Sequence, residues 1–175
     1  MKKIFISSDH AGFKLKESIK LYLNKKKIVY RDLGPSNDDR VDYPDYAHKV
    51  AKKVKTNKNH IGILICGSGM GMNIAANRHK NVRAAQCFNL KSTKLSRLHN
   101  DANIITLGSR LLSKNNAVKC IRIFLTLLKC LPPSNFVLKK ISIRLNALFL
   151  PINLSPNVMM FASLCNRDNL VFFLL

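Results

Sequence analysis

One stretch of the chain, residues 61–77, carries residue types that can perform chemistry at the edge of a sheet. Its sequence, IGILICGSGMGMNIAAN, begins with an apolar run ending at Cys66, which three alternating glycines follow: Gly67, Gly69 and Gly71. This order predicts a buried strand, a tight turn and a helix whose first N–H groups point into the turn. Such a turn binds anions, and a thiol at its mouth is placed to react with a bound molecule.

Two nucleotide-binding motifs use similar glycines, but the spacing here matches neither. A dinucleotide fingerprint reads G-x-G-x-x-G after the first strand, with an acidic residue ending the next strand. In this chain the third glycine of that spacing would fall on Met72, the turn follows the third strand, and residues 87–89 contain no acid. The sequence also has no Gly-Lys-Ser/Thr. The pattern argues against NAD and ATP, and leaves open that the glycines only let helix and sheet pack closely.

The elements around this turn alternate between strand and helix. Apolar runs predict strands at 3–7, 28–33, 61–66, 82–87 and 103–107, with amphipathic segments of helical spacing between them and after the last. The alternation predicts an α/β fold, a three-layer α/β/α Rossmann-like arrangement around a five-stranded parallel sheet. In the commonest five-stranded order the first and third strands are neighbours. We therefore expect one edge to collect the polar residues that follow strands: Asp9, His10, Cys66, Gly67 and Arg110.

Charge and cysteine content restrict the partners and the compartment. Lys and Arg outnumber Asp and Glu 30 to 9, a formal net charge of +21, but they are scattered along amphipathic stretches without a nucleic-acid motif. We interpret them as a solvated surface that attracts phosphorylated metabolites and does not bind nucleic acid. The five cysteines form no C-x-x-C pair and no zinc spacing, which indicates thiols in a reducing compartment. The run before Asp9 is too short for a signal peptide, so we expect a cytoplasmic location.

The chain changes character after Thr126. The last of its seven glycines is Gly108, whereas four of its six prolines lie beyond Thr126. Residues 145–166 are free of charge, but prolines interrupt them, so we expect no membrane span. The composition predicts a domain over 1–126, whose last helix runs to Thr126 or a few residues further. An atypical apolar and basic extension follows over 127–175, poorly ordered or covered by a partner.

Four separated motifs, in the right order, resemble one family. They are Asp9-His10-Ala11-Gly12-Phe13, Asp42-Tyr43-Pro44, the segment 66–71 (CGSGMG), and 95–103 (LSRLHNDAN) running into Gly108-Ser109-Arg110. Over about residues 1–126 the chain resembles the type B ribose-5-phosphate isomerases, a family that includes galactose-6-phosphate and allose-6-phosphate isomerases. The resemblance implies interconversion of ribose 5-phosphate and ribulose 5-phosphate through an enediolate, in the non-oxidative pentose phosphate pathway. It implies neither a metal nor a cofactor.

The resemblance gives the residues of the glycine turn their roles. Cys66 would be the base that removes a proton from carbon, and a helix N-terminus favours the thiolate that this requires. Backbone N–H groups and one hydroxyl would hold the enediolate oxygen; the residues concerned are Gly67, Ser68, Gly69, Met70 and Gly71. The alternative for Cys66 is an inert buried thiol that ends a strand.

Two residues of the fourth motif imply a partner subunit. His99 would open the sugar ring as an acid–base catalyst, because imidazole titrates near neutral pH, and Asn100 would hold substrate hydroxyls. In the resembled family these two reach the site of the neighbouring chain. The resemblance therefore implies a homodimer, or a dimer of dimers, with shared sites. Taken alone, His99 would be a surface histidine.

The remaining candidates surround the same edge. Asp9 would bind sugar hydroxyls and, as a catalytic residue, assist ring opening, and it could also cap the helix that follows Gly12. His10 and Arg110 would contact the hydroxyls or phosphate of the substrate, Arg110 through bidentate hydrogen bonds. Arg40 is a weaker candidate for the same edge.

The chain departs from the family after Phe124-Leu125-Thr126. The family continues there with an acidic, glycine-containing turn and a basic helix that supplies arginines to the phosphate, and neither is present in this sequence. We hypothesise a reading-frame change or a replaced 3′ end. Three functions stay open at this point: a pentose-phosphate isomerase with a weakened phosphate grip, an isomerase of six-carbon sugar phosphates, and a degenerate dimer that binds sugar phosphate without turnover.

Overall fold

Five strands and five helices alternate along residues 3–127, the part of the chain that the computed structural model describes. The strands are β1 (Ile4–Ser8), β2 (Tyr30–Asp32), β3 (Ile61–Cys66), β4 (Ala84–Gln86) and β5 (Ile104–Gly108). The helices are α1 (Phe13–Lys25), α2 (Tyr43–Val54), α3 (Met70–Asn77), α4 (Leu90–Leu98) and α5 (Lys114–Thr126). The last helix ends at Thr126, and the predicted extension lies, apart from residue 127, outside the described residues.

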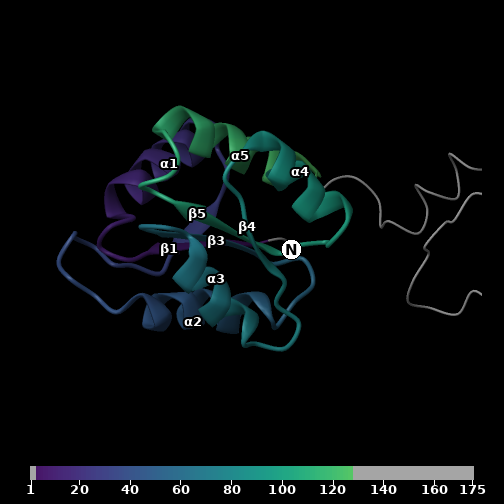
Figure 1. Cartoon of the computed structure of the whole chain (residues 1–175), viewed down its shortest axis with the longest axis horizontal. Helices are drawn as coiled ribbons and strands as arrows, with labels where there is room; N and C mark the ends of the chain where they lie inside the picture. The colour runs from purple at the N-terminus through teal and green to yellow at the C-terminus, as the bar shows by residue number, and fades with distance from the viewer. Residues whose placement is uncertain (1–2, 128–175) are drawn as a thin grey trace, which may run out of the picture. The chain divides into compact units, whose positions relative to one another are not determined.

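The five strands form one parallel sheet in the order β2-β1-β3-β5-β4. Helices α1, α4 and α5 cover one face, and α2 and α3 cover the other (Figure 1). This arrangement confirms the predicted α/β class with three layers and the pairing of the first and third strands. Because β5 lies directly beside β3, the two strands end together, with Cys66 opposite Gly108.

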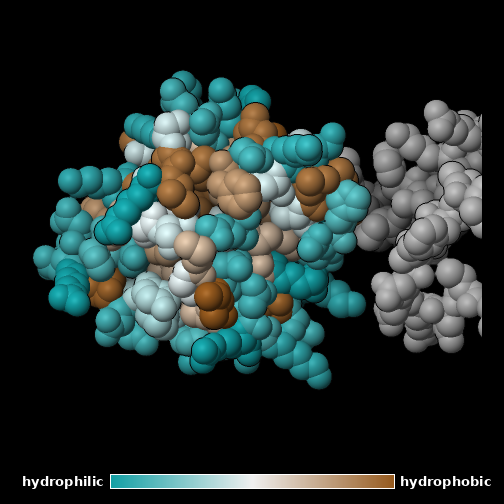
Figure 2. Space-filling view, in the orientation of Figure 1, coloured by the Kyte–Doolittle hydropathy of each residue, from teal (hydrophilic) through white to brown (hydrophobic). Residues whose placement is uncertain are grey.

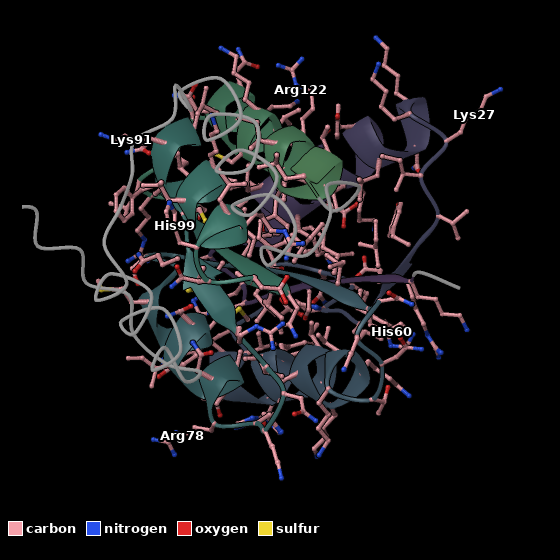
Figure 3. All side chains as sticks on the ribbon, turned by 90° about the vertical axis from the view of Figure 1, so that its right-hand side faces the viewer. Lys27, His60, Arg78, Lys91, His99 and Arg122 are labelled. Atoms are coloured by element: carbon pink, nitrogen blue, oxygen red, sulfur yellow. The ribbon has the colours of Figure 1, made fainter. Side chains whose placement is uncertain are left out.

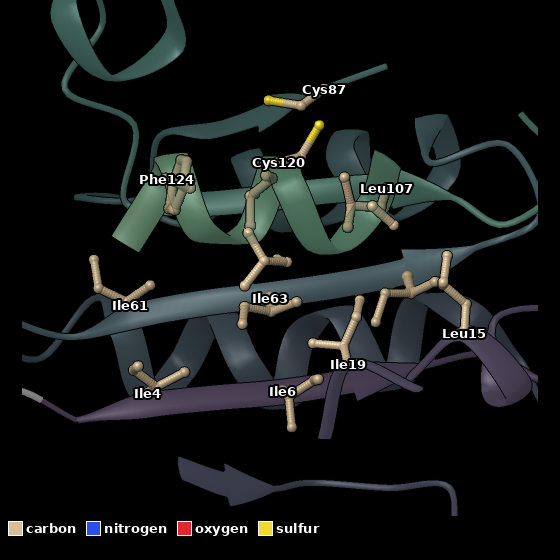
Figure 4. Packing of buried hydrophobic residues seen from close by; sticks show 14 of the residues in the cluster. Ile4, Ile6, Leu15, Ile19, Ile61, Ile63, Cys87, Leu107, Cys120 and Phe124 are labelled. Atoms are coloured by element: carbon tan, nitrogen blue, oxygen red, sulfur yellow. The ribbon is translucent and has the colours of Figure 1, made fainter. Parts of the chain in front are cut away.

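Strand β3 is buried on both faces, as the central strand of a parallel sheet is expected to be. Ile63 points into the core shared with α1 and α5 (Figure 4), and so does Ile65. Leu64 and Cys66 point into the core shared with α2 and α3. The alternation of side chains along a strand therefore directs the Cys66 thiol towards the layer that contains α3.

Two other cysteines, Cys87 and Cys120, are fully buried in the first of these cores. Figure 4 shows both among the apolar side chains that α5 packs against the sheet. Burial raises the pKa of each thiol above its ordinary value, so both remain protonated at neutral pH.

Lys16 is the exception among the described lysines, nearly all of which are exposed as the sequence predicts. Its side chain is 0% exposed, and its ammonium group lies 3.1 Å from Asp32 Oδ2 and donates a hydrogen bond to the carbonyl of Pro35. Lys16 therefore ties α1 to the end of β2 and to the loop that follows. Hydrophobic periodicity alone cannot predict that Lys16 is buried, because a lysine on the apolar face of a helix only interrupts the apolar pattern.

The edge strands and one helix differ in extent from their predictions. β2 and β4 have three residues each instead of six, and each lies at an edge where it pairs on one side. In the glycine stretch the helix-forming residue types begin at 73–76, but helix α3 already begins at Met70. Gly69 adopts a left-handed conformation (φ +81°), which starts the helix directly after the turn. Within residues 3–127 no helix is both long and apolar enough to cross a membrane.

Candidate active site

Cys66 ends β3 with its thiol against the start of α3. The residue is 4% exposed, and Sγ accepts a hydrogen bond of 3.1 Å from the backbone N–H of Gly69. A side chain at Gly69 would place its Cβ 3.0 Å from the backbone of Leu107 and Gly108 and would have to adopt φ +81°. Only glycine fits there without strain, so the turn brings an N–H donor and a helix N-terminus to the sulfur.

Two further hydrogen bonds fix the rest of the turn. The Ser68 hydroxyl accepts from the N–H of Met70 at 3.2 Å, and the Ser68 carbonyl accepts from Nε2 of Gln86 at 2.8 Å. The N–H groups of Gly69 and Met70 are thus used inside the turn. Those of Gly71 and Met72, in the first turn of α3, have no intrahelical acceptor. These two N–H groups and the Ser68 hydroxyl hydrogen are among the donors left for an anion.

Asp9 follows β1 and lies next to the end of β3. Its backbone N–H donates to the carbonyl of Ile65 at 3.0 Å, and its carboxylate Oδ1 accepts from the N–H of Gly12 at 2.7 Å. The carboxylate therefore holds the turn that precedes α1, although the N-cap residue of α1 is Gly12 and the helix has no side-chain cap. Its second oxygen is left for a ligand. Gly12 permits this approach, because a Cβ there would lie 2.4 Å from the Ile65 carbonyl oxygen.

Arg110 reaches the same edge from the end of β5. The N–H of Ser109 donates to the Cys66 carbonyl at 2.8 Å, and that of Arg110 donates to the Gly67 carbonyl at 3.0 Å. The guanidinium group covers Gly67, where a Cβ would lie 3.3 Å from Cζ of Arg110. A positive charge thus lies directly beside the turn that contains the thiol.

His10 and Arg40 lie further along the edge. Nδ1 of His10 is 3.4 Å from both the N–H nitrogen and the carbonyl oxygen of Val41, so His10 bonds to the loop before α2. Arg40 is exposed and lines a hollow of ≈ 720 Å³ on the outer side of α2, together with Asp42, Asp45 and other residues of that helix. His10 follows Asp9 at this edge, but it bonds the loop before α2 and forms no hydrogen bond with residues 66–71, and neither does Arg40.

Two residues of the site were given no role by the sequence. The ring of Tyr43 packs on Gly71, where a Cβ would lie 2.8 Å from Cε2 of the ring. Gln86 bonds the turn from β4, as described above. Tyr43 belongs to the motif Asp42-Tyr43-Pro44, which is the one signal that could have indicated it. Gln86 gives a weaker signal, a polar side chain ending a strand of small and apolar residues.

His99 and Asn100 lie at the opposite edge of the sheet. They follow α4 and precede β5, whereas Cys66 is level with the last residue of β5. Five residues of strand separate the two edges, about 16 Å at roughly 3.3 Å per residue. Both side chains are exposed, and Figure 3 shows His99 at the end of α4. Within one chain, the structure does not bring them to the thiol.

No group of three or more His, Cys, Asp or Glu side chains within residues 3–127 is arranged to hold a metal ion. The groups gathered at the edge are a thiol, a carboxylate, an imidazole, a guanidinium and free backbone N–H groups. Together they can bind an oxyanion and exchange a proton with a bound molecule.

An open parallel sheet with these groups at the carboxyl ends of β1, β3 and β5 defines a class of α/β proteins that bind anionic ligands where the strand order reverses. The family model described as Ribose/Galactose Isomerase matches residues 4–136. The chain belongs to this family.

Individual relatives agree with the family model. Ribose-5-phosphate isomerase B of Escherichia coli is 44% identical over 110 residues, which cover 63% of this chain and 74% of the relative. A ribose 5-phosphate isomerase of Thermotoga maritima superimposes with a TM-score of 0.71 at 42% identity, covering 81% of this chain and 95% of the other. The Mycoplasma genitalium ribose-5-phosphate isomerase B, solved with bound ribulose 5-phosphate, gives a TM-score of 0.71 at 39% identity, with 84% and 97% covered.

Proposed function

We propose that this protein is an aldose–ketose isomerase that interconverts ribose 5-phosphate and ribulose 5-phosphate, with Cys66 as the base. The observation that carries the proposal is the hydrogen bond from the N–H of Gly69 to Cys66 Sγ at the start of α3. This contact and the helix dipole both stabilise the negative charge of a thiolate. The relatives named as ribose-5-phosphate isomerases, one of them with bound ribulose 5-phosphate, support the choice of substrate.

The chemistry requires a proton to move between two neighbouring carbons. The Cys66 thiolate removes the proton from C2 of the open-chain aldose, and the electron pair moves into a C1–C2 double bond as the C1 carbonyl becomes an enediolate oxygen. The resulting thiol returns a proton to C1, the proton of the C2 hydroxyl passes to the C1 oxygen, and the C2 oxygen becomes the ketone. The thiolate is regenerated, so one residue serves as base and then as acid.

The enediolate oxygen acquires negative charge during this sequence, and the turn supplies donors for it. The N–H groups of Gly71 and Met72 and the hydroxyl of Ser68 remain available at the start of α3. Gly67 and Gly69 shape the backbone around them, and Met70 begins the helix. These fixed dipoles need no reorganisation as the charge develops, which is the most effective form of electrostatic catalysis.

The groups on either side of the turn orient the substrate. Asp9 accepts hydrogen bonds from sugar hydroxyls through the oxygen that Gly12 does not occupy. Arg110, beside Gly67, binds the anionic end of the substrate or its hydroxyls, and His10 contributes from the loop side.

The position of His99 and Asn100 supports a homodimer with shared sites. Both residues are exposed at the edge away from the Cys66 of their own chain. If they act in ring opening and hydroxyl binding, they must therefore reach the Cys66 thiol of a second subunit. Exposed apolar side chains occur on α3, on α4 and before α4, a composition typical of interfaces. They are Met70, Ile74, Phe88, Leu90, Leu95 and Leu98. Figure 2 shows such apolar side chains in patches among hydrophilic ones.

A subunit-mixing experiment tests the shared site. Cys66→Ala and His99→Asn subunits are mixed after separate purification and reversible dissociation. If each site combines Cys66 of one chain with His99 of the other, a mixed dimer contains one intact site, and an equal mixture regains about a quarter of wild-type activity. A mixture that stays inactive, with mixed dimers demonstrated by mass spectrometry, contradicts the sharing.

We place the reaction in the cytoplasm and in the non-oxidative pentose phosphate pathway. Cys66, Cys87 and Cys120 are all free thiols, as expected of a protein in a reducing compartment. The pathway assignment rests on the proposed substrate and on the names of the relatives.

Turnover by the purified full-length chain tests the proposed function and separates it from its alternatives. We expect conversion of ribose 5-phosphate to ribulose 5-phosphate with a higher kcat/KM than for allose 6-phosphate or galactose 6-phosphate. The reverse preference would assign a six-carbon substrate. Binding of ribulose 5-phosphate without turnover of any of the three would identify a non-catalytic binding protein.

A further inference from the structure

We infer that Gln86 is a positioning residue for Cys66, acting through the peptide unit between Ser68 and Gly69. The inference rests on the proposed role of Cys66 as the base. Gln86 is the last residue of β4, the edge strand, and its side chain is partly buried. Its side-chain hydrogen bond within residues 3–127 is to the backbone of Ser68 and not to the thiol.

The contact that carries the inference is the 2.8 Å hydrogen bond between Nε2 of Gln86 and the carbonyl oxygen of Ser68. A carbonyl oxygen can only accept, so the nitrogen of the side-chain amide must face it. The same peptide unit presents its N–H, that of Gly69, to Cys66 Sγ at 3.1 Å. Because a peptide unit is planar, with C=O and N–H pointing in opposite directions, a bond that fixes the carbonyl also fixes the N–H.

The same bond makes the N–H a better donor. Hydrogen bonds that share one amide polarise each other, so a donor on the Ser68 carbonyl strengthens the bond from Gly69 to sulfur. Gln86 thereby stabilises the thiolate form of Cys66 without contacting it.

The turn needs such a support because its own sequence leaves this peptide unit free to rotate. Three of its residues are glycines, and the conformation of Gly69 at φ +81° is one of several open to it. Gly108 of β5 provides the space, since a Cβ there would lie 2.6 Å from the Ser68 oxygen. The carbonyl thus lies against the glycine of β5, and Gln86 fixes it from β4.

The test replaces Gln86 by Met in the full-length protein, which keeps the length and packing of the side chain and removes the donor. Asn77→Ala is the matched control, because Asn77 also bonds β4 through its side-chain amide, to the N–H and carbonyl of Ala84, but does not contact the turn. Gln86→Leu serves as a second variant of different shape. Melting temperatures establish that each variant is folded.

Two readouts distinguish positioning from a merely structural role. The first is kcat and KM for ribose 5-phosphate. The second is the pH midpoint of the ultraviolet absorbance of the Cys66 thiolate, obtained by subtracting the titration of the same protein carrying Cys66→Ala. The second readout needs no isomerase activity, so it tests Gln86 even if the proposed substrate is wrong.

We expect Gln86→Met and Gln86→Leu to lower kcat about tenfold, the effect of losing roughly one hydrogen bond's free energy, with little change in KM. The thiolate midpoint should rise by about half a pH unit or more in both variants and stay unchanged in Asn77→Ala. An unchanged midpoint in folded Gln86→Met or Gln86→Leu would overturn the inference. A wild-type protein that lacks isomerase activity but shows the expected shift in Gln86→Met would refute the proposed function alone.

Discussion

Replacing Asp32 by Asn is expected to lower the free energy of unfolding by about 3 kcal/mol, although Asp32 is not part of the active site. The side chain of Lys16 is 0% exposed, and both oxygens of Asp32 approach its ammonium group, at 3.3 and 3.1 Å. Without this carboxylate, two acceptors remain near the buried Lys16 ammonium group. One is the Pro35 carbonyl, and the other is a carboxylate oxygen of Glu17 at 3.6 Å, whose side chain is 40% exposed. Breaking a buried pair typically costs 3–5 kcal/mol, and the two remaining acceptors put the expected loss at about the lower end.

The assay is urea unfolding at neutral pH, with two controls. Glu17→Gln removes a half-exposed carboxylate from the same cluster and should cost about 0.5 kcal/mol or less. The double variant Lys16→Met/Asp32→Asn removes the buried charge together with its partner. It should recover most of the unfolding free energy that Asp32→Asn alone loses. If the double variant is as unstable as Asp32→Asn alone, the destabilisation does not come from an unpaired ammonium group, and the reasoning is refuted.

The same pair makes a defined contribution to acid unfolding. Burial favours the neutral form of Asp32, but hydrogen bonds from Lys20, the N–H of Gly34 and Lys16 outweigh it and hold its pKa below the ordinary value. A carboxylate whose pKa is lower in the folded than in the unfolded state stabilises the folded protein at pH values above its unfolded-state pKa, which is about 4 for Asp. This stabilisation is lost as the pH falls through the pKa of the folded state. The stability of Asp32→Asn should therefore fall less steeply than that of the wild type below about pH 4.

Three further outcomes follow from single contacts. Gly69→Ala should lower the free energy of unfolding in urea by about 2 kcal/mol and remove most of kcat, because φ +81° and a Cβ at 3.0 Å from Gly108 N both oppose a side chain. Full stability and activity of this variant would show that the turn tolerates a Cβ. Ser8→Ala should gain about 1 kcal/mol, since the buried Ser8 hydroxyl has no hydrogen-bond partner among the described residues; a loss would reveal a partner. Burial raises the pKa values of Cys87 and Cys120, so both thiols should resist iodoacetamide in the folded protein at neutral pH and react with it in urea. Peptide mass spectrometry measures the modification, and equal reactivity in both states would contradict their burial.

The sequence predicts the fold well where hydrophobic pattern alone decides it. The bounds of β3 follow directly, because six apolar residues lie between polar His60 and the first glycine of the turn. The α/β class follows from the alternation of strands and helices. The position of β5 between β3 and β4 does not follow, since periodicity contains no information about which strands pair.

The site is predictable as far as it consists of residues that follow strands. Asp9, Cys66 and Arg110 meet at one edge because parallel strands place their carboxyl ends together. The supports of these residues are not predictable, because they depend on contacts between distant segments. The ring of Tyr43 on Gly71, the amide of Gln86 on Ser68 and the burial of Lys16 all arise from tertiary packing that no local pattern encodes.

The central claim is that the Cys66 thiolate removes the proton from C2 of ribose 5-phosphate. The most direct measurement compares kcat for ribose 5-phosphate and its C2-deuterated form in the wild type and in Cys66→Ala. We predict a primary isotope effect in the wild type and a fall in kcat of roughly a thousandfold in Cys66→Ala, the range expected for loss of a general base. A folded Cys66→Ala protein that isomerises ribose 5-phosphate within about tenfold of the wild-type rate would contradict the account.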